Sequence, residues 1–372
     1  MKLYEYQAKE VFKEAGIKIP TSVLIDHEAQ LEQAIEKVGL PFVVKSQVLS
    51  GGRGKAGLIS FVKTESDAKF HVNRLFSHEL KIKHLLIEEA INIEKEIYVS
   101  ITIDPVKATG LLIASAEGGI DIEILAVTQP DKIVKEPIDL RYGLMPYQTI
   151  TVCDELGLSP IQTKEMSKLL IKLYQVFKNY DAELVEINPL FITKNNEFVA
   201  GDGKLMIDDN SLFRQPRFER SLDDYKTEAE YDALIEGIPF IQFDGDIGLM
   251  CAGAGLTTTV YDLINYEGGT VANYLEFGGP NYKKAVKAME ICLKVPSKVI
   301  LIVTFGTIAR ADVMAEGIVD AMQRLKPDRP IVTCIRGTNE VEAVRILKEA
   351  GLEPLFDTEE AVKKAVLLSK EV

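Results

Sequence analysis

A glycine-rich segment in the first quarter of the chain could hold the phosphate groups of a ligand. Residues 50–57 read Ser-Gly-Gly-Arg-Gly-Lys-Ala-Gly. Glycines let the backbone approach a phosphate closely, and Arg53 and Lys55 add charge that a polyanion would use. The segment is not a Walker A loop, because it lacks G-x-x-x-x-G-K-[ST] and lies between two expected strands rather than before a helix. A solvated hairpin tip would have the same composition, so the loop alone leaves both interpretations open.

A lysine precedes this loop at the end of an apolar run, Phe42-Val43-Val44-Lys45. Burying a lysine in a strand is costly unless an anion compensates its charge. Lys45 therefore indicates either a nearby anion or a hairpin whose polar face carries this side chain into solvent.

Two acidic motifs further along could bind a hard cation. Glu183–Leu190 reads ELVEINPL and Val199–Lys204 reads VAGDGK. If the two segments form adjacent antiparallel strands, Asn188 and Asp202 lie side by side. Mg²⁺ prefers such oxygen donors, and it takes one or two of them together with water and phosphate oxygens. Asn-Pro and Asp-Gly are also common turn-forming pairs, so a structural role stays open.

Two glycine-containing turns in the last third of the chain are candidate anion sites. They lie within Ile247–Leu256 and Val303–Asp312, each between an apolar strand and a helix. A helix N-terminus exposes unpaired N–H groups, and parallel sheets bind ligands at the carboxyl ends of their strands. Ordinary strand-to-helix turns share this pattern, so it is not specific.

The histidines offer no catalytic pattern. His27, His71, His78 and His84 all lie in the first quarter of the chain, on stretches expected to be helical or at the surface. They form neither a catalytic triad nor a metal-ligand spacing. If the reaction uses a histidine nucleophile, another chain must supply it.

Short strands and helices must position these residues. We expect an amphipathic helix before Gly16, a hairpin at residues 42–62, and strands at His84–Glu88 and Glu96–Asp104. Strands and helices then mix up to about residue 208. The polar stretch at 209–240 is expected to be a linker.

Strands and helices alternate regularly in the last 130 residues or so. Right-handed crossovers between parallel strands would cover such a sheet on both faces, and five strand–helix units make a flavodoxin-like domain. The strands are expected at Ile247–Ala252, Val271–Phe277, Val299–Phe305, Ile331–Ile335 and Pro354–Phe356.

The composition of the 372 residues limits the classes of function. Apolar residues make up 47% and charged residues 27%, as in globular proteins, and the formal net charge is −13. This charge argues against nucleic acid or an anionic membrane as a partner, because both need a positive surface. The sequence has no segment typical of a signal peptide or a membrane span. Four well-separated cysteines are typical of reduced thiols, so we expect a cytoplasmic location and no zinc site.

Together, these motifs resemble the β subunit of succinyl-CoA synthetase, an ATP-grasp acid–CoA ligase. The resemblance spans nearly the whole chain and favours the functional interpretations of the N-terminal motifs over the structural ones. The stretches that resemble the family's signature segments, in the family's order, are Leu3–Lys9, Gly51–Gly57, Glu186–Leu190, Asp202–Lys204 and Leu212–Pro216.

The resemblance implies an α/β protein with two domains. The first, residues 1–240, would be an ATP-grasp fold of two α+β subdomains, and the second, residues 241–372, a flavodoxin-like CoA-ligase domain with a parallel sheet. Within the first, the smaller subdomain is expected at about 21–104, the remainder at 1–20 and 105–208, and the linker at 209–240.

The resemblance also implies roles for individual residues. Asn188 and Asp202 match the magnesium ligands, and Glu186 matches a carboxylate that steadies a phosphohistidine when it visits the nucleotide. That histidine belongs to the family's α subunit, which also binds most of the CoA, and this agrees with the lack of a catalytic histidine here. The residues that match the nucleotide site are Lys45, Gly52, Arg53 and Gly54 at the phosphates and Glu88, Ile91 and Glu96 near the base or ribose.

The implied reaction turns a small carboxylic acid, CoA and ATP into acyl-CoA, ADP and phosphate. Its three transfers are formation of an acyl phosphate, attack by the CoA thiolate, and movement of phosphate between the histidine and the nucleotide. The protein's work in such transfers is mainly positioning and charge stabilisation. Pro20 falls where adenine-preferring members are similar, which favours ATP over GTP.

One region departs from the family's succinate pattern. Members that use succinate carry an asparagine where this chain has Ala252, and Gly-Gly-Ile-Val where it has Gly306–Ala309. Losing the asparagine removes a hydrogen-bond donor, and a site built around such a bond discriminates strongly between substrates. We therefore expect either succinate or a hydroxylated, larger or sulfonate-bearing acid. The expected substrate residues are Ala252, Thr307, Ile308 and Ala309.

Two further interpretations are weaker. A stand-alone ATP-grasp ligase that joins a carboxylate to an amine has no need for the flavodoxin-like domain or for a histidine from another chain. A non-catalytic subunit that only pairs with a partner has no need to keep Lys45, Asn188 and Asp202 together.

Overall fold

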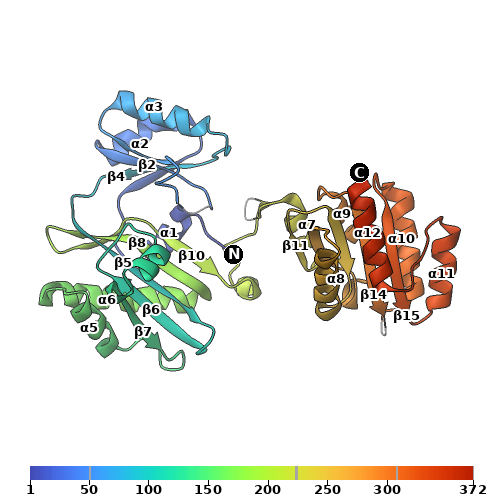
Figure 1. The fold of residues 1–372 in the computed structure, drawn as a ribbon. Coiled ribbons are helices and arrows are strands. Elements are labelled where there is room, and N and C mark those ends of the chain that lie inside the picture. Colours follow the sequence, from blue (N-terminus) through green and yellow to red (C-terminus); the bar gives the residue numbers. More distant parts are fainter. Residues whose placement is uncertain (50–51, 223–224, 307–308, 372) are drawn as a thin grey trace. The chain divides into compact units, whose positions relative to one another are not determined.

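The computed structural model describes residues 1–49, 52–222, 225–306 and 309–371. The chain divides into two units, Met1–Arg220 and Ser221–Val372, which Figure 1 shows in blue to green and in yellow to red. Each unit has its own sheets and its own buried apolar clusters.

The first sheet of the N-terminal unit is antiparallel, with strand order β1-β4-β2-β3. It carries the expected hairpin, because β2 pairs with β3 on either side of the glycine-rich loop. Phe42 and Val44 of β2 pack into the apolar cluster, so that Lys45 points to the opposite face. The elements are β1 (Ser22–Ile25), η1 (Glu28–Gln30), α2 (Leu31–Val38), β2 (Phe42–Ser46), β3 (Ile59–Val62), α3 (Glu65–Phe76) and β4 (Leu85–Glu89).

The second sheet has six antiparallel strands in the order β10-β8-β5-β6-β7, with β9 paired to β8. The largest apolar cluster of the unit lies between this sheet and the helices α1, α5 and α6. Its elements are α1 (Glu5–Glu14), β5 (Ile93–Asp104), β6 (Thr109–Ser115), α4 (Ile122–Thr128), η2 (Pro130–Lys132), β7 (Ile133–Ile138), α5 (Pro146–Glu155), α6 (Pro160–Asn179), β8 (Ala182–Thr193), β9 (Phe198–Ala200), β10 (Lys204–Ile207) and η3 (Asp209–Arg214).

The C-terminal unit is built on a sheet of order β11-β13-β12-β14-β15. The last four strands are mutually parallel, and the two faces carry separate apolar clusters. Figure 1 shows the helices covering this sheet. The elements are α7 (Glu228–Ile235), β11 (Phe240–Gln242), β12 (Ile247–Cys251), α8 (Ala254–Tyr266), β13 (Val271–Glu276), η5 (Gly279–Asn281), α9 (Ala285–Leu293), β14 (Val299–Gly306), α10 (Ala311–Leu325), β15 (Ile331–Gly337), α11 (Glu340–Glu349) and α12 (Thr358–Glu371).

Two strand expectations in this unit need correction. Pro354–Phe356 does not form a strand, because only Pro354 bridges to Thr333 of β15. The fifth strand is instead β11, which pairs antiparallel with the outer edge of β13. The parallel strands still follow the flavodoxin-like order, with β13 and β12 exchanged relative to their order in the sequence.

The expected boundaries also differ from the structural ones. The polar stretch at 209–240 is not one linker: η3 belongs to the N-terminal unit, whereas α7 and β11 belong to the C-terminal one. Small buried residues such as Ala229 and Ala233 attach α7 to its unit, and composition alone did not reveal them. The smaller subdomain, expected at about 21–104, is also shorter than expected. Its sheet ends with β4 at Glu89, because β5 joins the six-stranded sheet.

Candidate active site

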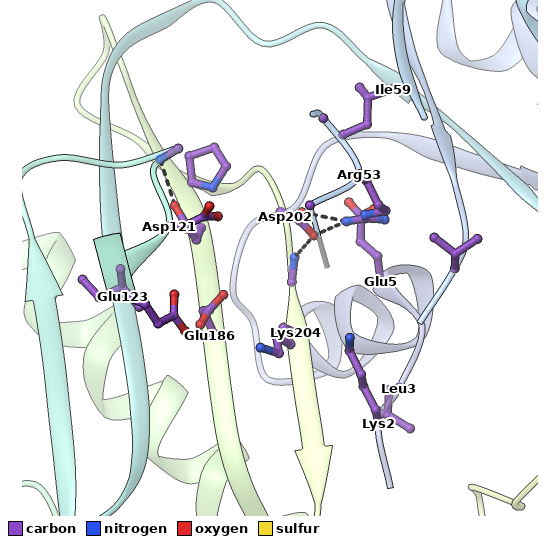
Figure 2. Close-up of a pocket in the computed structure, with 18 residues that line it drawn as sticks. Lys2, Leu3, Glu5, Arg53, Ile59, Asp121, Glu123, Glu186, Asp202 and Lys204 are labelled. Atoms are coloured by element: carbon purple, nitrogen blue, oxygen red, sulfur yellow. Dashed lines mark hydrogen bonds and ion pairs between the residues drawn. The ribbon is translucent and has the colours of Figure 1, made fainter. Parts of the chain in front are cut away.

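A cavity of about 410 Å³ lies in the N-terminal unit (Figure 2). Its wall combines the start of the chain, the β2–β3 loop, the residues that begin α4, and the strands β8 and β10 with the turn before β10. The glycine-rich loop and both acidic motifs therefore meet at one place. The expected site residues that line the cavity are Gly52, Arg53, Gly54, Glu186, Asn188 and Asp202.

Lys45 is buried behind this wall and is compensated by protein carboxylates. Its Nζ lies 2.6 Å from Glu88 Oε1 and 3.1 Å from Glu5 Oε1, and it donates to the carbonyl of Gly201 at 2.6 Å. Only 8% of the residue is exposed. The alternative in which Lys45 lies on a solvent face is therefore wrong. Its anions are Glu5 and Glu88, so contact with a ligand is not needed to explain its burial.

Lys9 is a second buried lysine in the same cluster. Its Nζ lies 2.8 Å from Glu5 Oε1, forms an ion pair with Glu88, and donates to Gly201 at 2.9 Å. Burial alone would raise the pKa of Glu5, but Lys45, Lys9 and Arg53 outweigh it and hold that pKa well below its usual range. The cluster ties α1, β2, β4 and the turn before β10 together.

Arg53 connects the glycine-rich loop to the second acidic motif. Its Nη2 lies 2.7 and 2.6 Å from the two carboxylate oxygens of Asp202, and its Nη1 contacts Glu5 (Figure 2). Burial and the negative charge of Glu5 raise the pKa of Asp202, while Arg53 works against this shift. A cation thus already stabilises the carboxylate that the sequence assigns to Mg²⁺.

Asn188 and Asp202 lie side by side, as the two-strand arrangement requires. Glu186 pairs with Lys204 and Leu190 with Ala200, and the Gly201 N–H donates to Pro189 at 2.9 Å, so Asn188 of β8 and Asp202 of the turn before β10 both lie between these two pairs. The Asn188 amide is oriented by the turn before α4, because its Oδ1 accepts from the Gly119 N–H at 2.8 Å and its Nδ2 donates to Ile120 at 3.0 Å. The cavity wall therefore offers one carboxylate and one amide oxygen next to each other.

Glu186 lies on the sheet face that lines the cavity. Lys204 pairs with it across β10 and β8, and Lys2 lies two residues along from Lys204 beside β10. Burial raises the pKa of Glu186, and the positive charge of Lys204 offsets part of this increase. Burial and repulsion by Lys204 lower the pKa of Lys2. Lys2, Lys204 and Glu186 thus lie on one wall of the cavity. Such a wall suits a ligand that has both a negatively charged group, for the lysines, and a positively charged or N–H group, for the carboxylate.

The three residues expected near a base or ribose do not line the cavity. Glu88 is only 2% exposed and is held by Lys45 and Lys9. Ile91 and Glu96 are half-buried in the connection between the two sheets and at the start of β5. Glu96 nevertheless adjoins the site, because its carbonyl accepts from the Gly118 N–H at 3.1 Å, one residue before Gly119.

The motif interpretation missed several side chains of this site. Glu5 and Lys9 had a signal in the sequence, since both fall within the Leu3–Lys9 segment, yet that segment was used only for its resemblance. Lys2 and Lys204 flank recognised motifs in the same way. Glu123 carried no recognisable signal, because it reaches the cavity only through the position of α4.

In the C-terminal unit, the expected substrate residues lie at the carboxyl edge of the sheet. Ala252 directly follows β12, and its N–H donates to Val303 of the neighbouring β14 at 3.2 Å. The strand order reverses between β12 and β14, which is where open parallel sheets bind ligands. Ala309 follows β14 and is only 8% exposed, packed in the apolar cluster. Thr307 and Ile308 lie outside the described residues.

Two absences concern the described part of the chain. No helix there has the length and apolar character needed to cross a membrane. The same residues contain no group of three or more His, Cys, Asp and Glu side chains that could hold a metal ion. None of the four histidines lines the cavity.

Comparisons with known proteins agree with this two-part architecture. Residues 2–192 match the ATP-grasp domain and residues 250–368 match the CoA-ligase domain. The ATP citrate lyase of Methanothrix soehngenii, solved with citrate and coenzyme A, shares the fold with a TM-score of 0.74 and 20% identity, covering 100% of this chain and 99% of that one. These domains define a nucleotide-using ligase.

Relatives that match along nearly their whole length identify the family of ligases. The chain is 69% identical to the ADP-forming sulfoacetate-CoA ligase subunit SqwK of an Acholeplasma species, over 100% of this chain and 92% of that protein. It is 57% identical to the corresponding subunit SauC of Bilophila wadsworthia, over 98% of each. It is 43% identical to the succinate–CoA ligase β subunit of Ignicoccus hospitalis, over 100% of each. The chain belongs to the family of ADP-forming acid–CoA ligase β subunits, which are acid–thiol ligases.

Proposed function

We propose that this chain is the nucleotide-binding subunit of an ADP-forming ligase that joins sulfoacetate to CoA. The observation that carries the proposal is the 69% identity, along the whole chain, to a subunit named for sulfoacetate, against 43% to one named for succinate. The same chemistry acting on succinate is the alternative. A cytoplasmic location, where thiols stay reduced, fits the free cysteines of the described chain.

The acid site supports the same choice of substrate. Ala252 replaces the asparagine of succinate-using members at the reversal of strand order between β12 and β14. A sulfonate differs from a carboxylate in having three acceptor oxygens in a tetrahedral array. A site shaped for it needs different donors, and changes among buried hydrogen-bond donors discriminate between substrates most strongly.

In this proposal the cavity of the N-terminal unit receives ATP. The amides of Gly52, Arg53 and Gly54 and the Arg53 guanidinium hold the phosphates. Ile91, in the connection between the sheets, and Glu96, near the start of β5, would border the base and ribose, and Glu88 would support them from within β4. Lys45 contributes from behind the wall, where it fixes Glu5 and Glu88. Backbone N–H groups in glycine-rich loops are well suited to phosphate oxygens.

The residues on the wall fit Mg²⁺ bound with a nucleotide. Asp202 supplies a carboxylate, which Arg53 now pairs with, and Asn188 supplies an amide oxygen. Such a set suits Mg²⁺, which keeps water and phosphate oxygens as its other ligands. When bound, the ion would neutralise charge on the phosphates.

The partner in this proposal is an α-type subunit that carries a histidine and binds most of the CoA. Its imidazole reaches the cavity, where Glu186 accepts the ring N–H and Lys204 and Lys2 attract the phosphoryl oxygens. No histidine among the described residues lines the cavity, and the relatives are named as subunits, which supports a histidine from another chain. The phosphohistidine then transfers its phosphoryl group to the acid substrate.

Turnover of the two-subunit complex tests the proposal. The chain would be co-expressed with its histidine-bearing partner and assayed for ADP release with ATP, CoA, and either sulfoacetate, succinate or a hydroxylated acid. We expect kcat/KM for sulfoacetate to exceed that for succinate by at least about tenfold. A preference for succinate would overturn the choice of acid, and ADP release that continues over many turnovers without CoA would overturn the class of reaction.

A further inference from the structure

Tyr98 is a buried tyrosine directly behind Glu186. Only 2% of it is exposed, and its hydroxyl lies 3.1 Å from Glu186 Oε2 and 2.9 Å from Ser100 Oγ. A phenol has one proton, and a carboxylate is a stronger acceptor than a hydroxyl. The Tyr98 proton therefore goes to Glu186, and the Ser100 hydroxyl stabilises the phenol oxygen.

The strand register explains why these three side chains meet. Tyr98 and Ser100 are two residues apart on β5, so they share one face of the sheet. Ser100 lies opposite Glu186 in the pairing of β5 with β8, and Lys204 lies opposite Glu186 on the other side. Glu186 thus accepts a hydrogen bond from Tyr98, with Ser100 and Lys204 at the neighbouring register positions on either side.

This arrangement leaves one carboxylate oxygen of Glu186 for a ligand. Oε2 accepts from Tyr98, whereas Oε1 has no hydrogen-bond partner among the described residues. Turning the carboxylate away would break its hydrogen bond with the buried Tyr98 hydroxyl, which favours the observed orientation. This orientation of Oε1 is therefore favoured before a partner arrives.

We propose that Tyr98, supported by Ser100, is a positioning residue for phosphoryl transfer. The inference rests on the proposed function, in which Glu186 meets the imidazole of the partner subunit. In that step the bond between the γ-phosphorus of ATP and the β–γ bridging oxygen breaks, and ADP leaves with the electron pair. A bond forms from the unprotonated imidazole nitrogen to phosphorus. The proton on the other ring nitrogen stays there, in a hydrogen bond to Glu186.

The hydroxyl contributes by orientation, so its removal affects the rate more than it affects nucleotide binding. Displacing a group by about 1 Å from its working position can cost about a hundredfold in rate. We expect Tyr98→Phe to slow phosphorylation of the partner by ATP about tenfold to a hundredfold, with the Kd for Mg-ADP unchanged. Ser100→Ala should slow it less, because it removes only the support of the phenol.

A matched control is available in the same unit. Tyr180 donates to Glu14 Oε2 at 3.3 Å at the exposed end of α6, away from the cavity. Tyr180→Phe removes an equivalent Tyr–Glu hydrogen bond and should leave the transfer rate at the wild-type level. Equal rates for Tyr98→Phe, Tyr180→Phe and wild type would overturn the inference.

A double-mutant cycle separates the inference from the proposed function. Glu186→Gln should slow the transfer, and adding Tyr98→Phe should then have little further effect, since both changes remove one interaction. A normal rate in Glu186→Gln would contradict the role of Glu186, and with it the inference. A slow Glu186→Gln combined with a fast Tyr98→Phe would overturn the inference alone. Rates are measured in the intact complex from labelled phosphate on the partner, with the Kd obtained by calorimetry.

Discussion

The guanidinium of Arg53 covers the carboxylate of Asp202, with Nη2 at 2.7 and 2.6 Å from its two oxygens. Asp202 is also the side chain that matches a magnesium ligand. If Asp202 binds Mg²⁺ as proposed, the ion and the guanidinium compete for the same two oxygens. We therefore expect Arg53 to give up at least one of its contacts with Asp202 when the metal–nucleotide binds, and phosphate oxygens offer it a charged acceptor of the same kind.

Arg53→Ala should consequently shift metal and nucleotide binding in opposite directions. Without the guanidinium, free Mg²⁺ meets an uncompensated carboxylate and should bind about tenfold more tightly, a change of about 1.4 kcal/mol. Mg-ADP should bind more weakly, because the arginine is lost from the phosphates. Calorimetric titrations with and without ADP measure both. Lys55→Ala, which removes an exposed ion pair with Asp121, is the control; the same pattern there would contradict the expectation.

Asp202→Ala should lower phosphorylation of the partner subunit by at least about a hundredfold, because preorganised charge stabilisation is the main contribution of a protein to this kind of transfer. Asp139→Ala serves as the control, since Asp139 pairs with Arg141 at the surface. Transfer at the wild-type rate in Asp202→Ala would remove Asp202 from the site. Labelled ATP and quenched-flow sampling of the complex give the rate.

Lys45→Met should destabilise the N-terminal unit by about 3 kcal/mol, because it leaves Glu5 and Glu88 buried with Lys9 as their remaining lysine. Lys55→Met should cost less than about 1 kcal/mol, since its ion pair is exposed. Urea unfolding followed by circular dichroism compares the two variants. Equal costs would mean that the buried cluster contributes no more than a surface pair.

The same cluster predicts how stability depends on pH. The pKa of Glu5 is lowered in the folded chain, so its contribution is complete above the unfolded value of about 4.3 and is lost as the pH falls below it toward the folded pKa. The pKa values of Asp202 and Glu186 are raised, which acts in the opposite direction. The difference in stability between wild type and Glu5→Gln should therefore be large at pH 7 and shrink below about pH 4. A constant difference across urea titrations would contradict this.

Local patterns were sufficient to predict the elements that bring Asn188 and Asp202 together. Asn188 lies in β8, and Asp202 lies in the short turn between β9 and β10, the two strands that pair with β8. The cluster around Glu5 was not predictable in this way. Its members come from α1, β2 and β4, and contacts between residues so far apart in the chain leave no periodic signal.

The short strands of the C-terminal unit also could not be predicted from local sequence patterns. Pro354–Phe356 is as apolar as a strand, whereas β11 stands in a polar neighbourhood, yet β11 pairs and Pro354–Phe356 gives only one bridge. Edge pairing depends on which segment the rest of the fold carries to the free side of β13. Tyr98 likewise looked like one more residue of an alternating strand until the register set it behind Glu186.

Restoring the asparagine of succinate-using members tests the choice of acid within this chain. Ala252 is half-buried beside the open edge between β12 and β14, and its N–H is bound to Val303, so the substitution keeps the backbone contact and adds only side-chain donors. Ala252→Asn should raise kcat/KM for succinate relative to sulfoacetate by at least about tenfold, since it restores the donor of succinate-using members and takes up space beside a sulfonate, which is larger than a carboxylate. Partner phosphorylation by ATP should not change, because it occurs before the acid binds. Ala350→Asn, at the end of α11, is the control. If Ala252→Asn lowered the rate with both acids equally, the residue would affect the packing of the sheet edge rather than the selection of the substrate.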